Sequence, residues 1–306
     1  MSSSSCFKWI FLNHFINILI SRIFKGRPMK KVKKLSLILS LILTAIIYSC
    51  SELPNEYLEK KGSVKDDSTL VKKALIEDYT GFTCGNCPYA HQEATRIHEE
   101  YGDKVILLAL HCSFYAKPTT AHPYDFRTET ATEWDNFFGI SNSGLPNGMV
   151  NRRGFLTSNN ILKYASWQET VDLVLAEKPI VSLDLSAIYL KESRQILAFV
   201  TYMYNEKLQK YHSLNVCIVE DSIVQYQKWY RHDPEDVNDY VHNHVFRTSL
   251  NGTWGEKLTS QIGIKTYSFT LPENSDWRPD KLKIVAFISD VGNTYEILQA
   301  EETDLK

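Results

Sequence analysis

Short apolar runs and helix-like patterns alternate along residues 70–179. The segment from Ala74 to Tyr79 is rich in apolar residues, and Val105 to His111 (VILLALH) is almost continuously apolar, which is typical of a strand buried on both faces. A further short strand is predicted at 149–151. Helical periodicity extends over 89–101, 124–138 and 158–177, and Pro179 ends the last of these segments. This alternation predicts an α/β domain.

After Pro179 the pattern changes to strands alone. Apolar residues alternate with polar or small residues in five segments, which are 180–190, 195–204, 213–220, 265–271 and 282–290. Turn sequences such as Asn251-Gly252 separate them. We therefore predict two domains, an α/β domain at 70–179 and an all-β sandwich of about 125 residues at 180–306.

The first 49 residues have the pattern of a secretory signal. Lys30, Lys31, Lys33 and Lys34 precede an apolar run from Leu35 to Tyr48, and Ser49–Cys50 follows. The run has about 15 residues, fewer than the roughly 20 that span a bilayer. Because Met29 directly precedes the lysines, we interpret it as the true start of the protein. A second membrane helix upstream is the alternative.

Cys50 resembles the lipidated cysteine of a bacterial lipobox. Ile46-Ile47-Tyr48-Ser49 precedes it, and the polar segment 51–69 follows. The resemblance implies that Cys50 carries acyl chains such as palmitate, becomes the mature N-terminus, and is joined to the fold by a tether over 50–69. An ordinary signal with an incidental cysteine and an uncleaved anchor are the alternatives.

Charge argues against a nucleic-acid partner. Residues 1–49 contain eight Lys or Arg and no Asp or Glu, so the remaining chain has 26 basic and 36 acidic side chains and a net charge of −10. Proteins that bind nucleic acids usually present a basic surface.

Two cysteines in the sequence DYTGFTCGNCP carry the clearest chemical signal. Cys84 and Cys87 lie between a predicted strand and a predicted helix, where the helix N-terminus stabilises a thiolate. We interpret Cys84 as the nucleophile and Cys87 as the resolving cysteine of a redox pair. A static disulfide and half of a zinc site are the alternatives, although zinc usually needs four ligands and no second CxxC occurs. We predict neither a cofactor nor a metal.

Residues 70–179 resemble a thioredoxin-fold domain. The resemblance rests on Leu75–Tyr79 before the cysteines, on Asp78 six residues before Cys84, and on Phe138-Gly139-Ile140 followed by Gly144-Leu145-Pro146. It implies that Asp78 lies beneath the disulfide, where it could take a proton from Cys87 through a water. It also implies that Pro146 is cis and faces the cysteines. Thr83 stands where thioredoxins have Trp, and 113–124 looks like an insertion.

Residues 50–306 also resemble a family of Gram-negative lipoproteins named for a 28-kDa outer-membrane protein. The marks are the lipobox, FTCGNCP, LPNGMVNRR at 145–153 and YVHNHVFRTSLNGTWGE at 240–256. The resemblance implies a lipid anchor in the outer membrane. Two functions are compatible with it: thiol–disulfide exchange with envelope or extracellular proteins, or surface binding and adhesion on a thioredoxin scaffold.

Other reactive side chains have simpler interpretations. Cys112 comes at the end of one predicted strand and Cys217 lies in another, and both are interpreted as inert core thiols. His91 could tune a thiolate or simply cover surface, and His242 and His244 are interpreted as packing or surface residues in preference to a metal pair. The acidic run 233–239 lacks the spacing of a calcium loop and predicts a solvated loop.

Overall fold

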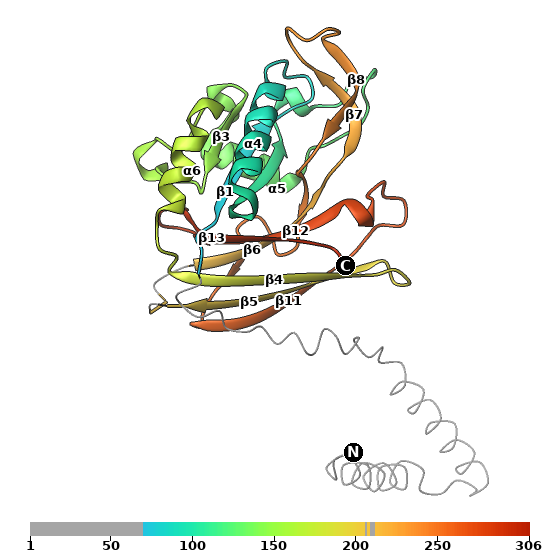
Figure 1. Cartoon of the computed structure of the whole chain (residues 1–306). Helices are drawn as coiled ribbons and strands as arrows, with labels where there is room; N and C mark the ends of the chain where they lie inside the picture. Colours follow the sequence, from blue (N-terminus) through green and yellow to red (C-terminus); the bar gives the residue numbers. More distant parts are fainter. Residues whose placement is uncertain (1–69, 206, 209–211) are drawn as a thin grey trace, which may run out of the picture. The chain divides into compact units, whose positions relative to one another are not determined.

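The computed structural model describes residues 70–205, 207–208 and 212–306, which belong to one compact unit (Figure 1). It is a mixed α/β structure in which most of the regular elements are strands. The predicted signal segment 1–49, the start at Met29, the lipidated Cys50 and the tether 50–69 lie outside the described residues.

An eight-stranded sheet is the centre of the fold. Its order is β13-β12-β6-β9-β2-β1-β3, and β10 pairs with β6 beside this path. β1 and β2 run parallel, and β3 pairs with β1 in the antiparallel direction. The strands are β1 (Ala74–Thr80), β2 (Val105–His111), β3 (Asn147–Val150), β6 (His212–Glu220), β9 (Val245–Ser249), β10 (Glu256–Lys257), β12 (Leu282–Asp290) and β13 (Ile297–Asp304).

This sheet corrects the predicted separation of domains 70–179 and 180–306. β2 meets β9 at Ala109 and Val245, so strands from both sides of residue 179 belong to one sheet. The physical reason lies in β6 and β12, which are apolar on both faces. Along β6, Val216 contributes to one core and Cys217 to the other. The boundary at 179 marks a change in element type, but it does not separate two sheets.

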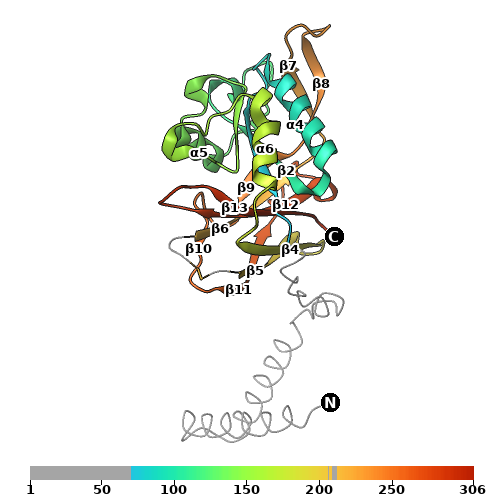
Figure 2. The same cartoon turned by 60° about the vertical axis from the view of Figure 1, so that its left-hand side comes forward.

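Three longer helices cover the β1–β2–β3 part of the sheet: α4 (Cys87–Tyr101), α5 (Glu129–Phe138) and α6 (Trp167–Leu175). α4 and α6 pack on one face through residues such as Ile97 and Trp167, and α5 packs on the other through Trp134 (Figure 2). Two helices are shorter than predicted. The Thr128 side chain caps α5 by accepting a hydrogen bond from the Ala131 N–H.

The C-terminal part is rich in β-structure, as predicted. β4 (Val181–Leu190), β5 (Gln195–Tyr204) and β11 (Ile262–Thr270) form a three-stranded antiparallel sheet. Alternate residues of β5, such as Ala198 and Val200, pack against Val216 of β6 and Ala286 of β12. Figure 1 shows this sheet as a layer beneath β6, β12 and β13.

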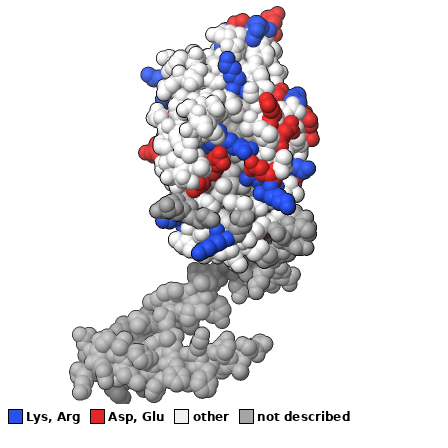
Figure 3. Space-filling view, turned by 90° about the vertical axis from the view of Figure 1, so that its left-hand side faces the viewer, with Lys and Arg blue, Asp and Glu red and all other residues white. Residues whose placement is uncertain are grey.

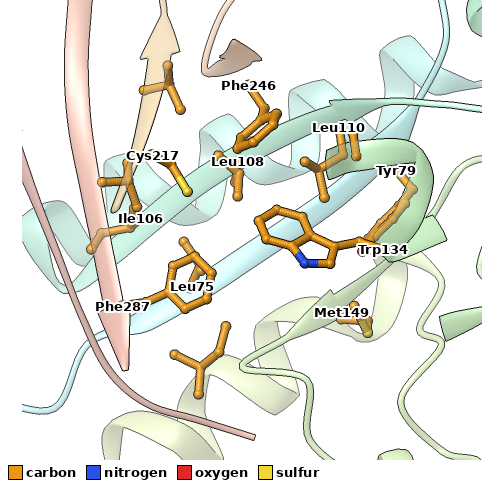
Figure 4. Close-up of a cluster of buried hydrophobic side chains, with 14 of the residues drawn as sticks. Leu75, Tyr79, Ile106, Leu108, Leu110, Trp134, Met149, Cys217, Phe246 and Phe287 are labelled. Carbon is orange, nitrogen blue, oxygen red and sulfur yellow. The ribbon is translucent and has the colours of Figure 1, made fainter. Parts of the chain in front are cut away.

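The core on the other face joins residues from both halves of the chain (Figure 4). Leu75 and Leu108 from the parallel pair meet Trp134 of α5 and Phe287 of β12. One ion pair is enclosed beside this core. Arg152 and Glu77 are both fully buried, and the Arg152 guanidinium also lies 4.8 Å from the Trp134 ring centroid.

A separate hairpin stands beside α4. It consists of β7 (Ile223–Lys228) and β8 (Asp236–His242), which pair only with each other (Figures 1 and 2). Neither strand was predicted from the sequence, and residues 233–239 were expected to form a solvated loop. The structure corrects this, because 236–239 belong to β8.

The surface carries charges of both signs. On the face shown in Figure 3, Lys and Arg lie next to Asp and Glu, so this face has no continuous basic area. Among the described residues, none of the helices combines the length and the apolar character needed to cross a membrane.

Candidate functional site

The two cysteines of the CxxC motif form a disulfide between β1 and α4. Their Cα atoms are 5.4 Å apart. The Cys84 N–H donates to the Gly81 carbonyl at 2.9 Å, and the Cys87 N–H donates to the Cys84 carbonyl at 3.1 Å. These bonds form two successive turns after β1. The helix then begins at Cys87, with Pro88 in its first turn, where the missing N–H of proline costs nothing.

This geometry corrects the expected environment of Cys84. It lies in the turn before α4, and Cys87 is the residue that begins the helix. Cys84 is also not open to solvent: its exposed fraction is 3 %, and that of Cys87 is 0 %. An incoming thiolate therefore has no direct access to either sulfur in this conformation.

The β7–β8 hairpin covers the disulfide loop. The Lys228 N–H donates to the Phe82 carbonyl at 2.8 Å, and the Tyr230 N–H donates to the Gly85 carbonyl at 2.8 Å. The buried Gln227 side chain donates to the Cys84 carbonyl at 3.1 Å. Residues 227–230 thus lie along the loop as an added extended segment, and we call them the cover segment.

Close packing explains the glycine inside the CxxC motif. A Cβ atom on Gly85 would lie 2.5 Å from Cγ of Tyr230, which is closer than real Cβ contacts. The Tyr89 hydroxyl donates to the Tyr230 carbonyl at 2.8 Å and fixes the same part of the cover segment from α4. Glycine at position 85 therefore lets the cover segment approach the disulfide.

Asp78 lies in β1 with an exposed fraction of 5 %. Burial raises the pKa of its carboxyl to about 8, because the ionised form loses its hydration. Its Oδ2 atom is 3.7 Å from Nε2 of His91, and its Oδ1 atom has no hydrogen-bond partner in the protein. At neutral pH this carboxyl is mostly protonated and is able to give or take a proton.

His91 belongs to a hydrogen-bonded network rather than to the open surface. Its Nε2 shares a hydrogen bond with Thr80 Oγ1 at 2.8 Å, and its Nδ1 shares one with the Tyr240 hydroxyl at 2.7 Å. Burial lowers the pKa of His91 to about 3, so the ring is neutral near pH 7. A neutral ring contributes no charge that would stabilise a thiolate.

The Leu145–Pro146 peptide bond is cis. Pro146 directly precedes β3, whose Asn147 pairs with Tyr79 of β1. This register places Pro146 beside the end of β1 from which the cysteine loop leaves. Topology thus brings Asp78, Pro146 and the cysteine pair to one end of one strand.

The two other cysteines among the described residues are free and buried. Cys112 and Cys217 form no disulfide, and burial raises the pKa of both thiols, which disfavours the reactive thiolate. Among residues 70–205, 207–208 and 212–306, no group of three His, Cys, Asp or Glu side chains is arranged to hold a metal ion.

Sequence reasoning missed the cover segment. Gln227 and Tyr230 lie about 140 positions after the cysteines they contact, as the separation of 143 between Gln227 and Cys84 shows. No spacing or periodicity links segments so far apart. A solvated loop was predicted at 233–239, but nothing in the sequence indicated a hairpin or the surface that it would cover.

Comparison with known proteins gives a family match and a structural match. A model of the family described as "Outer membrane protein Omp28" matches residues 132–306, a range that begins after the cysteine pair. No curated protein matches in sequence. The structure is similar to HBP35 of Porphyromonas gingivalis, with a TM-score of 0.58 and 15 % identity over 78 % of this chain and 76 % of that one.

A second solved structure is a domain of the outer membrane lipoprotein Omp28 from Porphyromonas gingivalis. It covers 42 % of this chain and 91 % of that one, with 18 % identity and a TM-score of 0.30. The similarity to HBP35 shows a common fold, and the second similarity is too low to add to it.

Proposed function

This chain belongs to the Omp28 family of outer membrane proteins, and we propose that it is a lipoprotein whose Cys84–Cys87 pair exchanges disulfides within a thioredoxin-like unit. The observation that carries the proposal is the position of the disulfide. It links the end of β1 to the start of α4, with a buried Asp78 in the same strand. Proposed partners are envelope or extracellular proteins with thiols or disulfides.

The element order supports the thioredoxin-like assignment. The features that support it are a parallel β1–β2 pair, an antiparallel β3 preceded by a cis proline, and a helix that begins at the second cysteine of the CxxC motif. The additional strands of the large sheet and the second sheet extend this unit. A fold shared with other proteins does not assign a reaction, so the chemistry needs its own argument.

Exchange in the oxidising direction has two steps. Once the cover segment has moved away from the disulfide loop, a substrate thiolate attacks Sγ of Cys84, the Cys84–Cys87 bond breaks, and Cys87 leaves as a thiolate. A second substrate thiolate then attacks the substrate sulfur of the mixed disulfide, and Cys84 leaves. The substrate loses two electrons to form its disulfide, and the cysteine pair gains them as two thiols. The protonated Asp78 carboxyl is the proposed proton donor to Cys87, through a water.

The proposed anchor is the lipidated Cys50, with residues 1–49 removed as a signal segment and residues 50–69 as the tether. A lipid-attached protein diffuses in the plane of the membrane, which raises the effective concentration of membrane-associated partners.

Trapping of a mixed disulfide tests the redox proposal. In a Cys87→Ala variant, the free Cys84 thiolate should attack a disulfide of a test protein and stay joined to it as a mixed disulfide, because no second cysteine resolves the adduct. The Cys84→Ala variant should capture little, and Cys112→Ala is the matched control that should behave like the unmodified protein. If neither Cys87→Ala nor Cys84→Ala forms an adduct, the proposal is wrong.

The burial of the disulfide supports a second candidate function, a binding lipoprotein that uses the unit as a scaffold. Both cysteines have exposed fractions of 3 % or less beneath the cover segment. The reduction potential of the pair separates the two functions. A value well below about −300 mV, where structural disulfides lie, favours the scaffold, and a higher value favours exchange.

A further inference from the structure

A cavity of about 320 Å³ lies between α4, the ends of β1 and β2, and β8. Its inner wall combines apolar side chains with ring nitrogens and a carboxyl. The polar groups come from four different elements and are Asp78, His91, His111, Tyr240 and His242. Its volume is at the lower end of the range of small-molecule sites in proteins.

Two imidazole rings in this wall are almost completely buried. The exposed fractions of His111 and His242 are 2 % and 3 %, and the ring centroids are 5.5 Å apart. None of their four ring nitrogens has a hydrogen-bond partner in the protein within normal geometry. The Phe126 ring stacks on His111 at 4.3 Å and lies 4.7 Å from His242, so packing holds both rings in place.

Unpartnered buried polar groups are costly, and proteins rarely retain them without a use. The rings of both histidines border the cavity, although their nitrogens are sealed from solvent in this conformation. A half-turn of either ring about its Cβ–Cγ bond exchanges nitrogens with carbons within the same packing, and can bring a nitrogen to a molecule inside the cavity. In a neutral imidazole one nitrogen donates and the other accepts, so the two rings offer both kinds of hydrogen bond.

The inner wall carries little charge near pH 7. Burial lowers the pKa of His242 to about 4 and the pKa of His111 well below its usual value. The backbone at Tyr226 and Gln225 raises the pKa of His242, but by less than burial lowers it. Burial also keeps Asp78 mostly protonated, because its pKa is about 8. A charged molecule would lose its hydration here without gaining a counter-charge.

The other charged residues that line the cavity belong to its outer part. The side chain of Arg96 is 46 % exposed and is paired with Glu93 and Glu100, and Glu99 is exposed. The described residues offer no trio of metal ligands here, so a bound cation is not the occupant that the arrangement favours.

We propose that this cavity binds an uncharged small molecule with a ring-sized apolar body and a hydrogen-bonding group that meets His111 and His242. Apolar side chains such as Ile76, Ala94 and Leu107 contact the body of the ligand, and the imidazoles orient its polar end. The cavity shares Asp78 with the proposed exchange reaction, and binding in it requires no movement of the cover segment.

Three probes of equal ring size test the proposal: benzamide, which is neutral, benzoate, which is an anion, and benzamidine, which is a cation. They are titrated at pH 7 into the full chain labelled with ¹³C and ¹⁵N on histidine, and the imidazole signals are followed by NMR. Benzamide should shift the His111 and His242 signals saturably, and the two charged probes should not at the same concentrations. Nuclear Overhauser contacts from benzamide to these rings locate the probe without any substitution.

An Ala94→Met variant provides the matched test, because the longer side chain fills the cavity from α4 without a change of charge. It should abolish saturable binding of benzamide. Leu173→Met changes an exposed residue of α6 that does not line the cavity, also without a change of charge, and should leave binding unchanged. The proposal is overturned if benzamide gives no saturable shift, which would indicate a cavity that holds water only. Equal binding of benzoate or benzamidine, or binding that survives Ala94→Met, would also overturn it.

Discussion

The Tyr230 N–H donates a hydrogen bond of 2.8 Å to the carbonyl of Gly85, inside the CxxC motif. This bond joins the β7–β8 hairpin to the loop that holds the disulfide. Access to Cys84 therefore depends on a contact made by Tyr230, a residue that lies far from Cys84 in the sequence. The first prediction concerns this contact.

A Gly85→Ala variant should expose the disulfide. The new Cβ would lie 2.5 Å from Cγ of Tyr230, so the cover segment must shift outward. Loss of one of its backbone hydrogen bonds would favour opening by about 1 kcal/mol, and we expect reduction by dithiothreitol to become roughly five- to tenfold faster. The rate is measured by thiol release over time.

Two further variants control this experiment. Val224→Ala changes an exposed residue of the same hairpin and should leave the reduction rate unchanged. Tyr230→Ala combined with Gly85→Ala removes the clash and should bring the rate back toward that of Tyr230→Ala alone. An unchanged rate in Gly85→Ala would show that the cover segment does not limit access.

The buried carboxyl of Asp78 should make the protein less stable as the pH rises from about 4 to about 8. The pKa of this carboxyl is about 8 in the folded protein and 3.8 for an unperturbed aspartate, so the folded state holds a proton that the unfolded state has lost. Within this window each pH unit lowers the free energy of unfolding by at most about 1.4 kcal/mol. Above pH 8 the effect is complete.

An Asp78→Asn variant tests this dependence through urea unfolding at several pH values. The difference in unfolding free energy between the variant and the unmodified protein should change steadily from pH 4 to 8 in favour of the variant. Asp135→Asn, which alters another buried aspartate, serves as the comparison. A difference that stays constant with pH would contradict the raised pKa.

The Glu77–Arg152 pair should be essential for stability. Arg152 donates through Nη2 to Glu77 Oε1 at 2.6 Å, and both side chains have an exposed fraction of 0 %. Glu77→Gln leaves a buried guanidinium without its counter-charge, which typically costs about 3–5 kcal/mol. Urea unfolding should detect this loss, whereas Arg127→Gln, in an exposed pair with Asp125, should change little. Similar small effects of both variants would contradict the prediction.

The proposed lipid anchor at Cys50 lies outside the described residues and is tested by substitution. Cys50→Ala should abolish labelling by a radioactive fatty acid and release the protein from the membrane fraction. Cys6→Ala removes the other cysteine of the N-terminal segment and should have no effect. Labelling that persists in Cys50→Ala would exclude Cys50 as the acylated residue.

Local patterns predicted much of the fold. The apolar run 105–111 coincides with β2, and the strands predicted at 195–204 and 282–290 coincide with β5 and β12. These elements are specified by their own residues. The helix predicted at 158–177 was too long, because α6 begins only at Trp167. The turns before it contain apolar residues at a spacing similar to that of the helix.

Long-range pairing could not be predicted in the same way. The bridge between Ala109 and Val245 joins two strands. The apolar pattern of each strand is compatible with many other strands as pairing partners. The cavity between α4 and β8 arises from the same kind of pairing. His91 and His242 were visible as residues, but only the position of the hairpin shows that they line one space.

The distance along the chain between the cysteines and their cover has a consequence for biosynthesis. Gln227 follows Cys84 by 143 residues, and at usual rates of synthesis that interval lasts on the order of 10 s. During this interval Cys84 and Cys87 have been made, but the segment that later encloses them has not. The oxidation state of the pair can therefore be set by the surroundings of the growing chain, and completion of the hairpin then preserves that state.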